Sequence, residues 1–280
     1  MVLSTERRWH HQALIYGLLL AGLVIVAVPF LLMVSTSIKP QQYTFEYPPR
    51  LIPSEVTLNN YVQALTKDLF FRYFLNSLLV AVLTTAITVL VSALLAYAFA
   101  RLDFPGKEAL FYLFLVGMMI PPVTLIIPQF LVAKALDLLY KHSGLVVVYV
   151  TMNLAMQTFL LRGFFEGIPG DLEDAVRIDG GGNWTIFWRL ILPLSQPGLA
   201  TVAIFTFLYS WDEFPWAHVA IKETTLRTLP IAIALFQNQH LTQWGQVFAA
   251  SVVALVPVVL VFALFQRHFI RGIATSGLKG

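Results

Sequence analysis

Cysteine is absent from the 280-residue sequence, and charged residues make up only 12% of it. The first absence excludes disulfide bonds, thiolate metal sites and cysteine nucleophiles. The second argues against a soluble domain, which carries about 25% charged residues on its solvated surface. Hydrophobic residues reach 58% and the mean hydropathy is +0.75. Most of the surface must therefore face lipid, and intrinsic disorder is excluded.

Two further absences exclude whole classes of function. The net charge of +3 is spread over 18 basic and 15 acidic residues without a basic stripe, so we expect no nucleic-acid partner. The sequence also lacks a G-x4-G-K-[ST] motif, since the one Gly-Lys pair, Gly106-Lys107, has no glycine at the required upstream position. Without that phosphate-binding loop the chain cannot hydrolyse ATP in the usual way.

Long runs without charge predict six membrane-spanning helices. A helix rises about 1.5 Å per residue, so about 20 residues cross the hydrocarbon core. The runs also lack the alternating pattern of barrel strands. We therefore expect an all-α membrane protein with a single transmembrane domain over residues 1–280 and a core region of about 70–268. The predicted spans cover about residues 13–36, 74–100, 109–131, 143–161, 196–215 and 247–266.

The first span could instead be a cleaved secretory signal, since Arg7 and Arg8 precede it. Its apolar run is longer than that of a typical signal, and no small-x-small cleavage pattern follows, so we expect it to remain. Six spans place both termini on one side of the membrane. If that side is cytoplasmic, ten Lys and Arg residues lie inside and eight outside. This weak excess favours cytoplasmic termini.

Polar and helix-breaking residues within the spans indicate where a substrate could pass. Pro121 and Pro122 interrupt the third span, and transporters often place broken helices beside their substrate path. A structural kink without a functional role is the alternative. In the fourth span Asn153 and Gln157 share one helix face. That face either bonds a neighbouring helix or lines a sugar-sized polar path.

The fifth span ends in Y-S-W-D-E-F-P-W, with two adjacent acids at its edge. Acids at membrane depth indicate function, whereas aromatic residues around a polar pair are also typical of an interfacial belt. Sugars need mixed hydrogen bonding and often an aromatic platform, which Tyr209 or Trp211 would supply. The predicted substrate path therefore comprises Asn153, Gln157, Tyr209, Trp211, Asp212 and Glu213. The proline-rich loop 38–71 is either a structured external connector or a docking surface for an external partner.

The longest internal loop, residues 162–193, contains a short predicted helix at about 171–180. Asp171 is a helix-start residue and Gly180 a stop. Leu172, Ala175 and Val176 give the helix one apolar stripe. So short a helix is marginal alone in water. It needs the bundle behind it or a groove on a partner, unless it lies on the lipid surface.

This loop resembles the EAA signature of ABC-importer permeases, E-A-A-x3-G-x9-I-x-L-P. Asp174-Ala175-Val176 occupies the E-A-A positions, and Gly180 is the glycine. Leu190 and Leu192-Pro193 follow at the matching spacing. The departures are aspartate for glutamate, valine for alanine and leucine for isoleucine. The segments S-I-K-P at residues 37–40, M-I-P-P at 119–122 and S-W-D-E-F at 210–214 narrow the resemblance to the smaller, maltose-type permease of carbohydrate importers.

The resemblance implies the type I importer permease fold, with six transmembrane helices and a cytoplasmic coupling helix in a prokaryotic inner membrane. It implies a second, homologous permease, two ATPase subunits that hold ATP and Mg, and an extracytoplasmic solute-binding protein. This chain would bind no cofactor itself. The tail, residues 267–280, would run along the ATPase subunits. The implied coupling residues are Glu173, Asp174, Ala175, Asp179, Gly180, Leu192 and Pro193.

Several alternatives of substrate and class remain at this stage. No Lys or Arg lies within a span to neutralise a phosphate, which favours a neutral sugar over glycerol 3-phosphate or another polyol. A membrane serine protease would need a G-x-S-x-G-like motif and a histidine within the spans, and neither is present. A simple channel would need no coupling helix.

Overall fold

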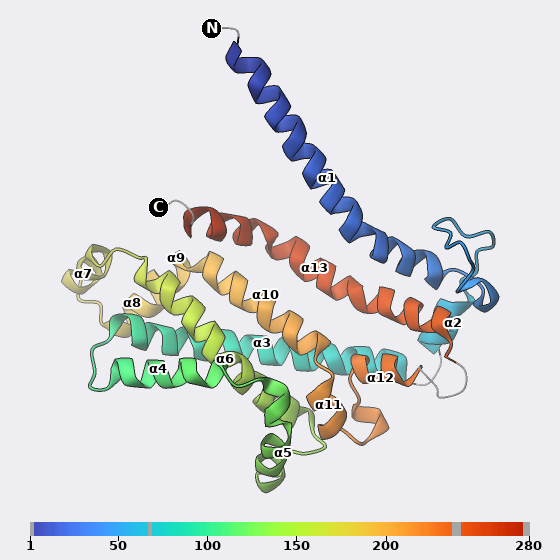
Figure 1. The fold of residues 1–280 in the computed structure, drawn as a ribbon. Helices are drawn as coiled ribbons and strands as arrows, with labels where there is room; N and C mark the ends of the chain where they lie inside the picture. Colours follow the sequence, from blue (N-terminus) through green and yellow to red (C-terminus); the bar gives the residue numbers. More distant parts are fainter. Residues whose placement is uncertain (1–2, 67–68, 237–241, 277–280) are drawn as a thin grey trace. The chain divides into compact units, whose positions relative to one another are not determined.

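The computed structural model describes the backbone of residues 3–66, 69–236 and 242–276, and these residues are all helix, turn or loop (Figure 1). The chain divides into two compact units. The first is Met1–Phe70 with Ile233–Leu255, and the second is Phe71–Ala232 with Val256–Gly280. The all-helical fold class is confirmed, whereas the single domain over residues 1–280 stays a prediction.

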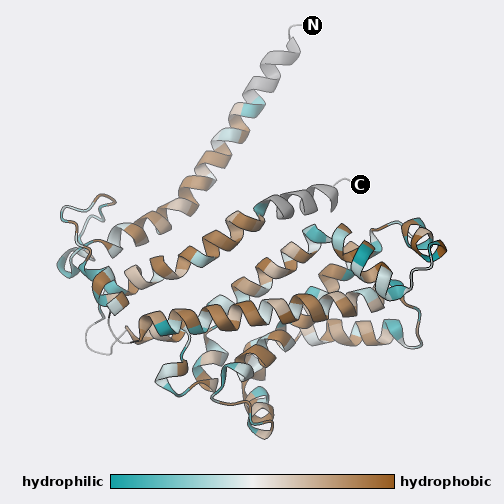
Figure 2. Ribbon diagram, turned by 180° about the vertical axis from the view of Figure 1, so that it is seen from behind, coloured by the Kyte–Doolittle hydropathy of each residue, from teal (hydrophilic) through white to brown (hydrophobic). Residues whose placement is uncertain are grey.

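Among the described residues, four helices are long and apolar enough to cross a membrane without a break. Two further spans are bent helix pairs, so the total reaches the predicted six when each pair is counted as one span. Figure 2 shows the hydrophobic colour along most of α3. The unbroken helices are α1 (Leu3–Ser37), α3 (Phe70–Arg101), α6 (His142–Glu166) and α13 (Trp244–Ser276).

The third span is broken at the predicted prolines. It consists of α4 (Lys107–Met118), the 3-10 turn η2 (Pro122–Leu125) and α5 (Ile126–Ala135). The two halves are bent by 95°. Pro121 is extended, with φ −60° and ψ 128°, and Pro122 begins the 3-10 turn. Neither proline has an N–H for the helical ladder, which explains why the helix ends before them.

The fifth span is also bent, by 77°, between Asn183–Leu194 and Gln196–Asp212. The first half comprises α8 (Asn183–Ile186), the π-helical segment η3 (Phe187–Ile191) and α9 (Leu192–Leu194). The second half is α10 (Gln196–Asp212), with Pro197 in its first turn. The chain continues through α11 (Pro215–Ala220), η4 (Thr224–Leu226) and α12 (Leu229–Leu235).

In the first unit, side chains hold the proline-rich loop after α1. The Asn60 amide, on α2 (Asn59–Thr66), donates to the carbonyls of Ser37 at 2.9 Å and Lys39 at 2.8 Å. The Lys39 ammonium in turn lies 2.9 Å from the Glu46 carboxylate and 2.7 Å from the Arg50 carbonyl. The short turn η1 (Gln41–Tyr43) lies between Lys39 and Glu46 in the sequence. The loop is thus a structured connector, and its role as a docking surface stays a prediction.

The second unit is organised around α6, which packs against α10, α4 and α11. One apolar cluster includes Leu145 and Tyr149 of α6 together with Trp216 of α11. A second cluster, nearer the Arg101 end of α3, includes Tyr97 and Phe165. These two clusters fix the positions of the helices from which the candidate functional residues project.

Candidate functional site

The short helix predicted at about 171–180 is present as α7 (Asp171–Ile178), and its coupling role stays a prediction. Three acids lie in its first turn, where negative charge favours the helix dipole. The helix stop predicted at Gly180 is also present, as a left-handed turn with φ +83°. The Gly180 N–H donates to the Arg177 carbonyl at 3.0 Å, which closes the helix. A residue with a side chain would be strained in this conformation.

The buried face of α7 is not the one that its apolar stripe predicts. Asp174 and Ala175 are exposed, and Ile178 is 86% exposed. Leu172 is exposed too, whereas Val176 is half-buried. The buried residue of the helix is Glu173, which is only 7% exposed. The exposed face of α7 is therefore free for a partner, while its acidic Glu173 is directed into the chain. Hydrophilic residues gather around α7 in Figure 2.

Arg101, the last residue of α3, explains the burial of Glu173. Its Nε lies 3.0 Å from Glu173 Oε1, and the two side chains form an ion pair. The Nη2 group of the same guanidinium donates to the carbonyls of Phe165 and Ile168, at the end of α6 and just beyond it. A buried carboxylate needs such a counter-charge. The sequence showed Arg101 only as the charge that ends an apolar run, and its partner could not be inferred from that.

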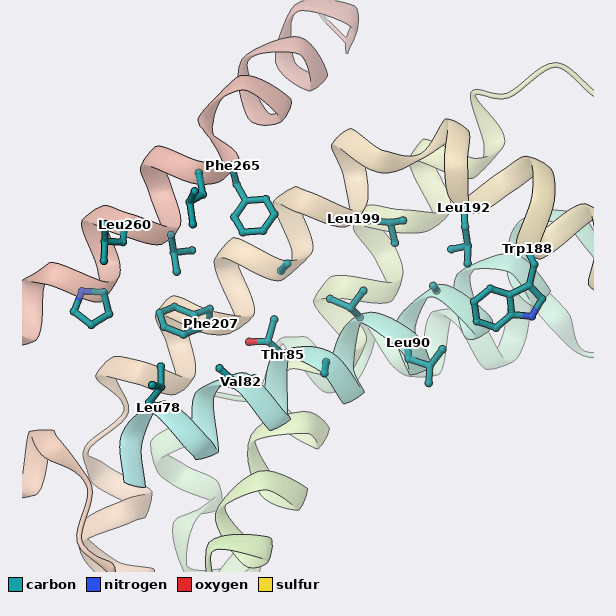
Figure 3. Close-up of a pocket in the computed structure, with 17 residues that line it drawn as sticks. Leu78, Val82, Thr85, Leu90, Trp188, Leu192, Leu199, Phe207, Leu260 and Phe265 are labelled. Atoms are coloured by element: carbon teal, nitrogen blue, oxygen red, sulfur yellow. The ribbon is translucent and has the colours of Figure 1, made fainter. Parts of the chain in front are cut away.

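The second half of the predicted motif lies apart from the exposed face of α7. Pro193 is exposed and begins the short helix α9 with Leu192. Leu192 lines an apolar cavity of about 680 Å³ between α3, α10 and α13 (Figure 3). Of the lining side chains only those of Thr85 and Trp188 carry a polar atom, and the Thr85 hydroxyl already donates to the Ala81 carbonyl at 2.7 Å. The cavity offers too few hydrogen-bonding groups to hold a sugar.

A second cavity, of about 440 Å³, lies beside the break in the third span. Its lining includes Pro122, Val123 and Ile126 of the broken span together with Tyr209 of α10. The structure thus brings the broken span together with part of the predicted substrate path. The predicted path residues that line this cavity are Tyr209, Asp212 and Glu213.

The other three predicted path residues lie elsewhere. Asn153 is buried and donates to the Tyr149 carbonyl of its own helix at 2.8 Å. Gln157 is 3% exposed, and its Oε1 has no hydrogen-bond partner among the described residues. Trp211 is buried against the rings of Phe74 and Phe207, with centroid distances of 5.4 and 5.8 Å. None of the three lines either described cavity.

The two adjacent acids have different surroundings. Glu213 accepts hydrogen bonds from the Tyr149 hydroxyl at 2.5 Å and from the backbone N–H groups of Trp216 at 2.7 Å and Ala217 at 3.0 Å. It therefore caps α11. Asp212 is exposed, so its carboxylate is the one available to a ligand in the cavity. Within the described part of the chain no group of His, Asp and Glu is arranged to hold a metal ion.

Sequence comparison identifies the family. Residues 89–275 match the family described as binding-protein-dependent transport system inner membrane component. The permease SmoH of the sulfoquinovosyl glycerol transport system of Agrobacterium fabrum is 36% identical, over 90% of this chain and 88% of that protein. The diacetylchitobiose uptake permease NgcG of Streptomyces coelicolor is also 36% identical, over 98% and 90%. The trehalose permease SugB of Mycobacterium tuberculosis is 35% identical, over 90% and 92%.

Comparison with solved structures shows that this chain shares its fold with a chain of a known ABC transporter. A chain of a bacterial ABC transporter that imports the acidic polysaccharide alginate superimposes with a TM-score of 0.79 at 22% identity, over 94% of this chain and 98% of that chain. The family match and the similar relatives make the protein a multi-pass permease of an ABC importer, whose ATP is hydrolysed by a separate ATPase. The chain belongs to the family of inner membrane components of binding-protein-dependent transport systems.

Proposed function

We propose that this chain is one of two homologous permeases in an ATP-driven importer of a neutral sugar. The cavity beside the broken third span carries the proposal, because Tyr209 and the exposed Asp212 meet there. A tyrosine ring offers a platform for a sugar face, and a carboxylate accepts hydrogen bonds from sugar hydroxyls. The relatives named as trehalose and diacetylchitobiose permeases support a sugar substrate.

Charge within this cavity favours a neutral substrate. Its lining contains the carboxylates of Asp212 and Glu213 and includes neither lysine nor arginine. A phosphate or a sugar acid would be repelled there, and no cation of the lining would compensate. The alternative substrates, glycerol 3-phosphate and other polyols, differ in this respect, because only the phosphate carries a negative charge.

The family supports a proposal for the remaining partners. We infer that the complex holds two ATPase subunits with ATP and Mg, and that one of them binds the exposed face of α7, where Asp174, Ala175 and Asp179 are accessible. Gly180 ends this helix, and Leu192 and Pro193 lie in the short helix α9. An extracytoplasmic binding protein delivers the sugar from the other side. Cytoplasmic termini in a prokaryotic inner membrane are consistent with ten Lys and Arg residues on the side of α7 against eight on the other.

Uptake by the complete complex tests the substrate class. The chain is co-purified with its partner permease and ATPase and reconstituted into proteoliposomes with the binding protein. We expect ATP-dependent uptake of a labelled neutral disaccharide that excess glycerol 3-phosphate does not inhibit. Asp212→Lys should lower this uptake at unchanged assembly, whereas the matched change Glu223→Lys, at an exposed acid outside the cavity, should not. Uptake of glycerol 3-phosphate and not of sugar would overturn the proposal.

A further inference from the structure

The Arg101 end of α3 holds the chain on both sides of α7. Arg101 binds the carbonyls of Phe165 and Ile168, which precede α7, and pairs with Glu173 within it. One turn earlier on the same face of α3, the Tyr97 hydroxyl donates to the Asn183 carbonyl at 3.2 Å. Asn183 begins the first helix after α7. The segments entering and leaving α7 are therefore both fastened to α3.

The opposite end of α3 is fastened in the same way to a different segment. The Asn76 amide donates to the carbonyls of Thr225 at 3.0 Å and Arg227 at 2.9 Å. The neighbouring Ser77 hydroxyl accepts a hydrogen bond from the Leu229 N–H at 2.8 Å. Asn76 and Ser77 are both buried. Backbone groups of the segment from η4 to the start of α12 are thus bound by two adjacent side chains of α3.

The helix between these two ends is built to be stiff. The predicted span 74–100 is the only one of the six without glycine or proline. The α3 helix continues for 32 residues without a break, a length of about 48 Å at 1.5 Å per residue. The third and fifth spans are bent, and α1 and α13 contain Pro29 and Pro257. Prolines and glycines are the usual sites of helix kinks, so α3 is the span least able to absorb a displacement by bending.

We propose that α3 transmits displacement of α7 across the membrane to residues 224–229, with Arg101 and Asn76 as positioning residues at its two ends. Packed helices move as rigid bodies, and their ends move together. When the exposed face of α7 is displaced by a partner, Arg101 and Tyr97 carry α3 with it, and Asn76 carries the opposite loop. The inference rests on the proposed function, since it assumes that an ATPase displaces α7.

Both ends of α3 are tested with the complex in nanodiscs. The quantity measured is the stimulation, which is the rate of ATP hydrolysis with the ligand-loaded binding protein divided by the basal rate. Asn76→Leu removes the two bonds to the opposite loop, and Arg101→Lys keeps the charge but loses the forked geometry. Each should reduce the stimulation by about five-fold or more, the low end of typical allosteric coupling, while basal hydrolysis persists. The matched controls are Asn59→Leu and Arg72→Lys, both at exposed positions, and should keep the stimulation of the unmodified complex.

A combined variant distinguishes transmission from two local effects. If α3 transmits the displacement from one end to the other, the double variant Asn76→Leu with Arg101→Lys should lose no more stimulation than the more affected single variant. Losses that multiply, or stimulation that is unchanged in both single variants, would overturn the proposal. Tyr97→Phe removes one hydroxyl, keeps the ring against Phe187, and should reduce stimulation even if Arg101→Lys does not assemble. The two proposals fail separately. If the sugar proposal is wrong, ATP hydrolysis by the unmodified complex is stimulated by the binding protein loaded with a different ligand.

Discussion

The Tyr149 hydroxyl lies 2.5 Å from Glu213 Oε2, and this contact joins α6 to the end of the fifth span. Glu213 also accepts two backbone N–H bonds at the start of α11. The sequence left two interpretations for the adjacent acids, a functional pair or an interfacial belt. In the structure Glu213 is a helix cap that lines the cavity, and Asp212 beside it is exposed.

Removal of the Glu213 cap should destabilise the protein. Glu213→Ala should lower the free energy of unfolding by about 2 kcal/mol, because hydrogen bonds to a charged group contribute about 1.5–3 kcal/mol. Tyr149→Phe should cost less, about 1 kcal/mol as for other bonds within membrane proteins. Denaturant unfolding in detergent measures both. Asp212→Ala serves as the control and should stay within about 0.5 kcal/mol, as for a surface substitution.

Gly180→Val should uncouple ATP hydrolysis from transport. The glycine adopts φ +83°, and a left-handed conformation costs a residue with a Cβ about 1–2 kcal/mol, so the turn that ends α7 should be distorted. Sugar-stimulated ATPase activity of the reconstituted complex should therefore fall. Gly182→Val is the matched control, since Gly182 has φ −87° and open space around its Cβ position. Equal activity of the two variants would show that this turn plays no part in coupling.

Asn153→Ala and Gln157→Ala separate a structural amide from a sugar ligand. Both side chains are buried and neither lines the cavity. Asn153→Ala should lower stability by about 1 kcal/mol through its lost hydrogen bond, and Gln157→Ala should lower it through the void that the side chain leaves. Tyr209→Ala should instead reduce uptake while assembly and basal ATPase activity persist. Unfolding and uptake are measured on the same three preparations. Normal stability with lost uptake in the amide variants would place the sugar path along α6.

Truncation after Gly272 tests the role of the tail. The side chains of residues 267–280 lie outside the described residues, so the prediction rests on the polar sequence and the family resemblance. The shortened chain should recover less ATPase during co-purification, or show weaker stimulation by the binding protein. Alanine replacement of Lys279 alone controls for the loss of one charge. A truncated complex that assembles and transports normally would contradict the prediction.

The positions of the spans and their breaks could be predicted because they depend on local chemistry. Charge-free runs must be buried in lipid, and Pro121 and Pro122 end a helix wherever they occur. Gly180 was found for the same reason. The orientation of α7 could not be predicted, because the apolar stripe at Leu172 and Ala175 favoured a different buried face. Arg101 reverses that preference, since its charge stabilises Glu173 inside the protein.

The cavity was only partly predictable for a similar reason. Polar residues at Asn153, Gln157 and Tyr209 all suggested a path, and the sequence does not say which of them face one another. Tyr209 lies in the cavity, whereas the Asn153 amide is bonded to its own helix. The same side chain can serve packing or a ligand, and the choice depends on contacts between helices distant in sequence.

Cysteine cross-linking to the ATPase tests the central claim most directly, because the chain has no native cysteine. Ala175→Cys places a single thiol on the exposed face of α7, and Ile52→Cys places one on the loop after α1, where Ile52 is 85% exposed. In membranes that contain the assembled complex, Ala175→Cys labelled with a maleimide photo-crosslinker should link to the ATPase on illumination. Ile52→Cys should instead react with a membrane-impermeant thiol reagent added outside. An ATPase cross-link to Ile52→Cys and none to Ala175→Cys would contradict both the coupling role of α7 and the proposed orientation.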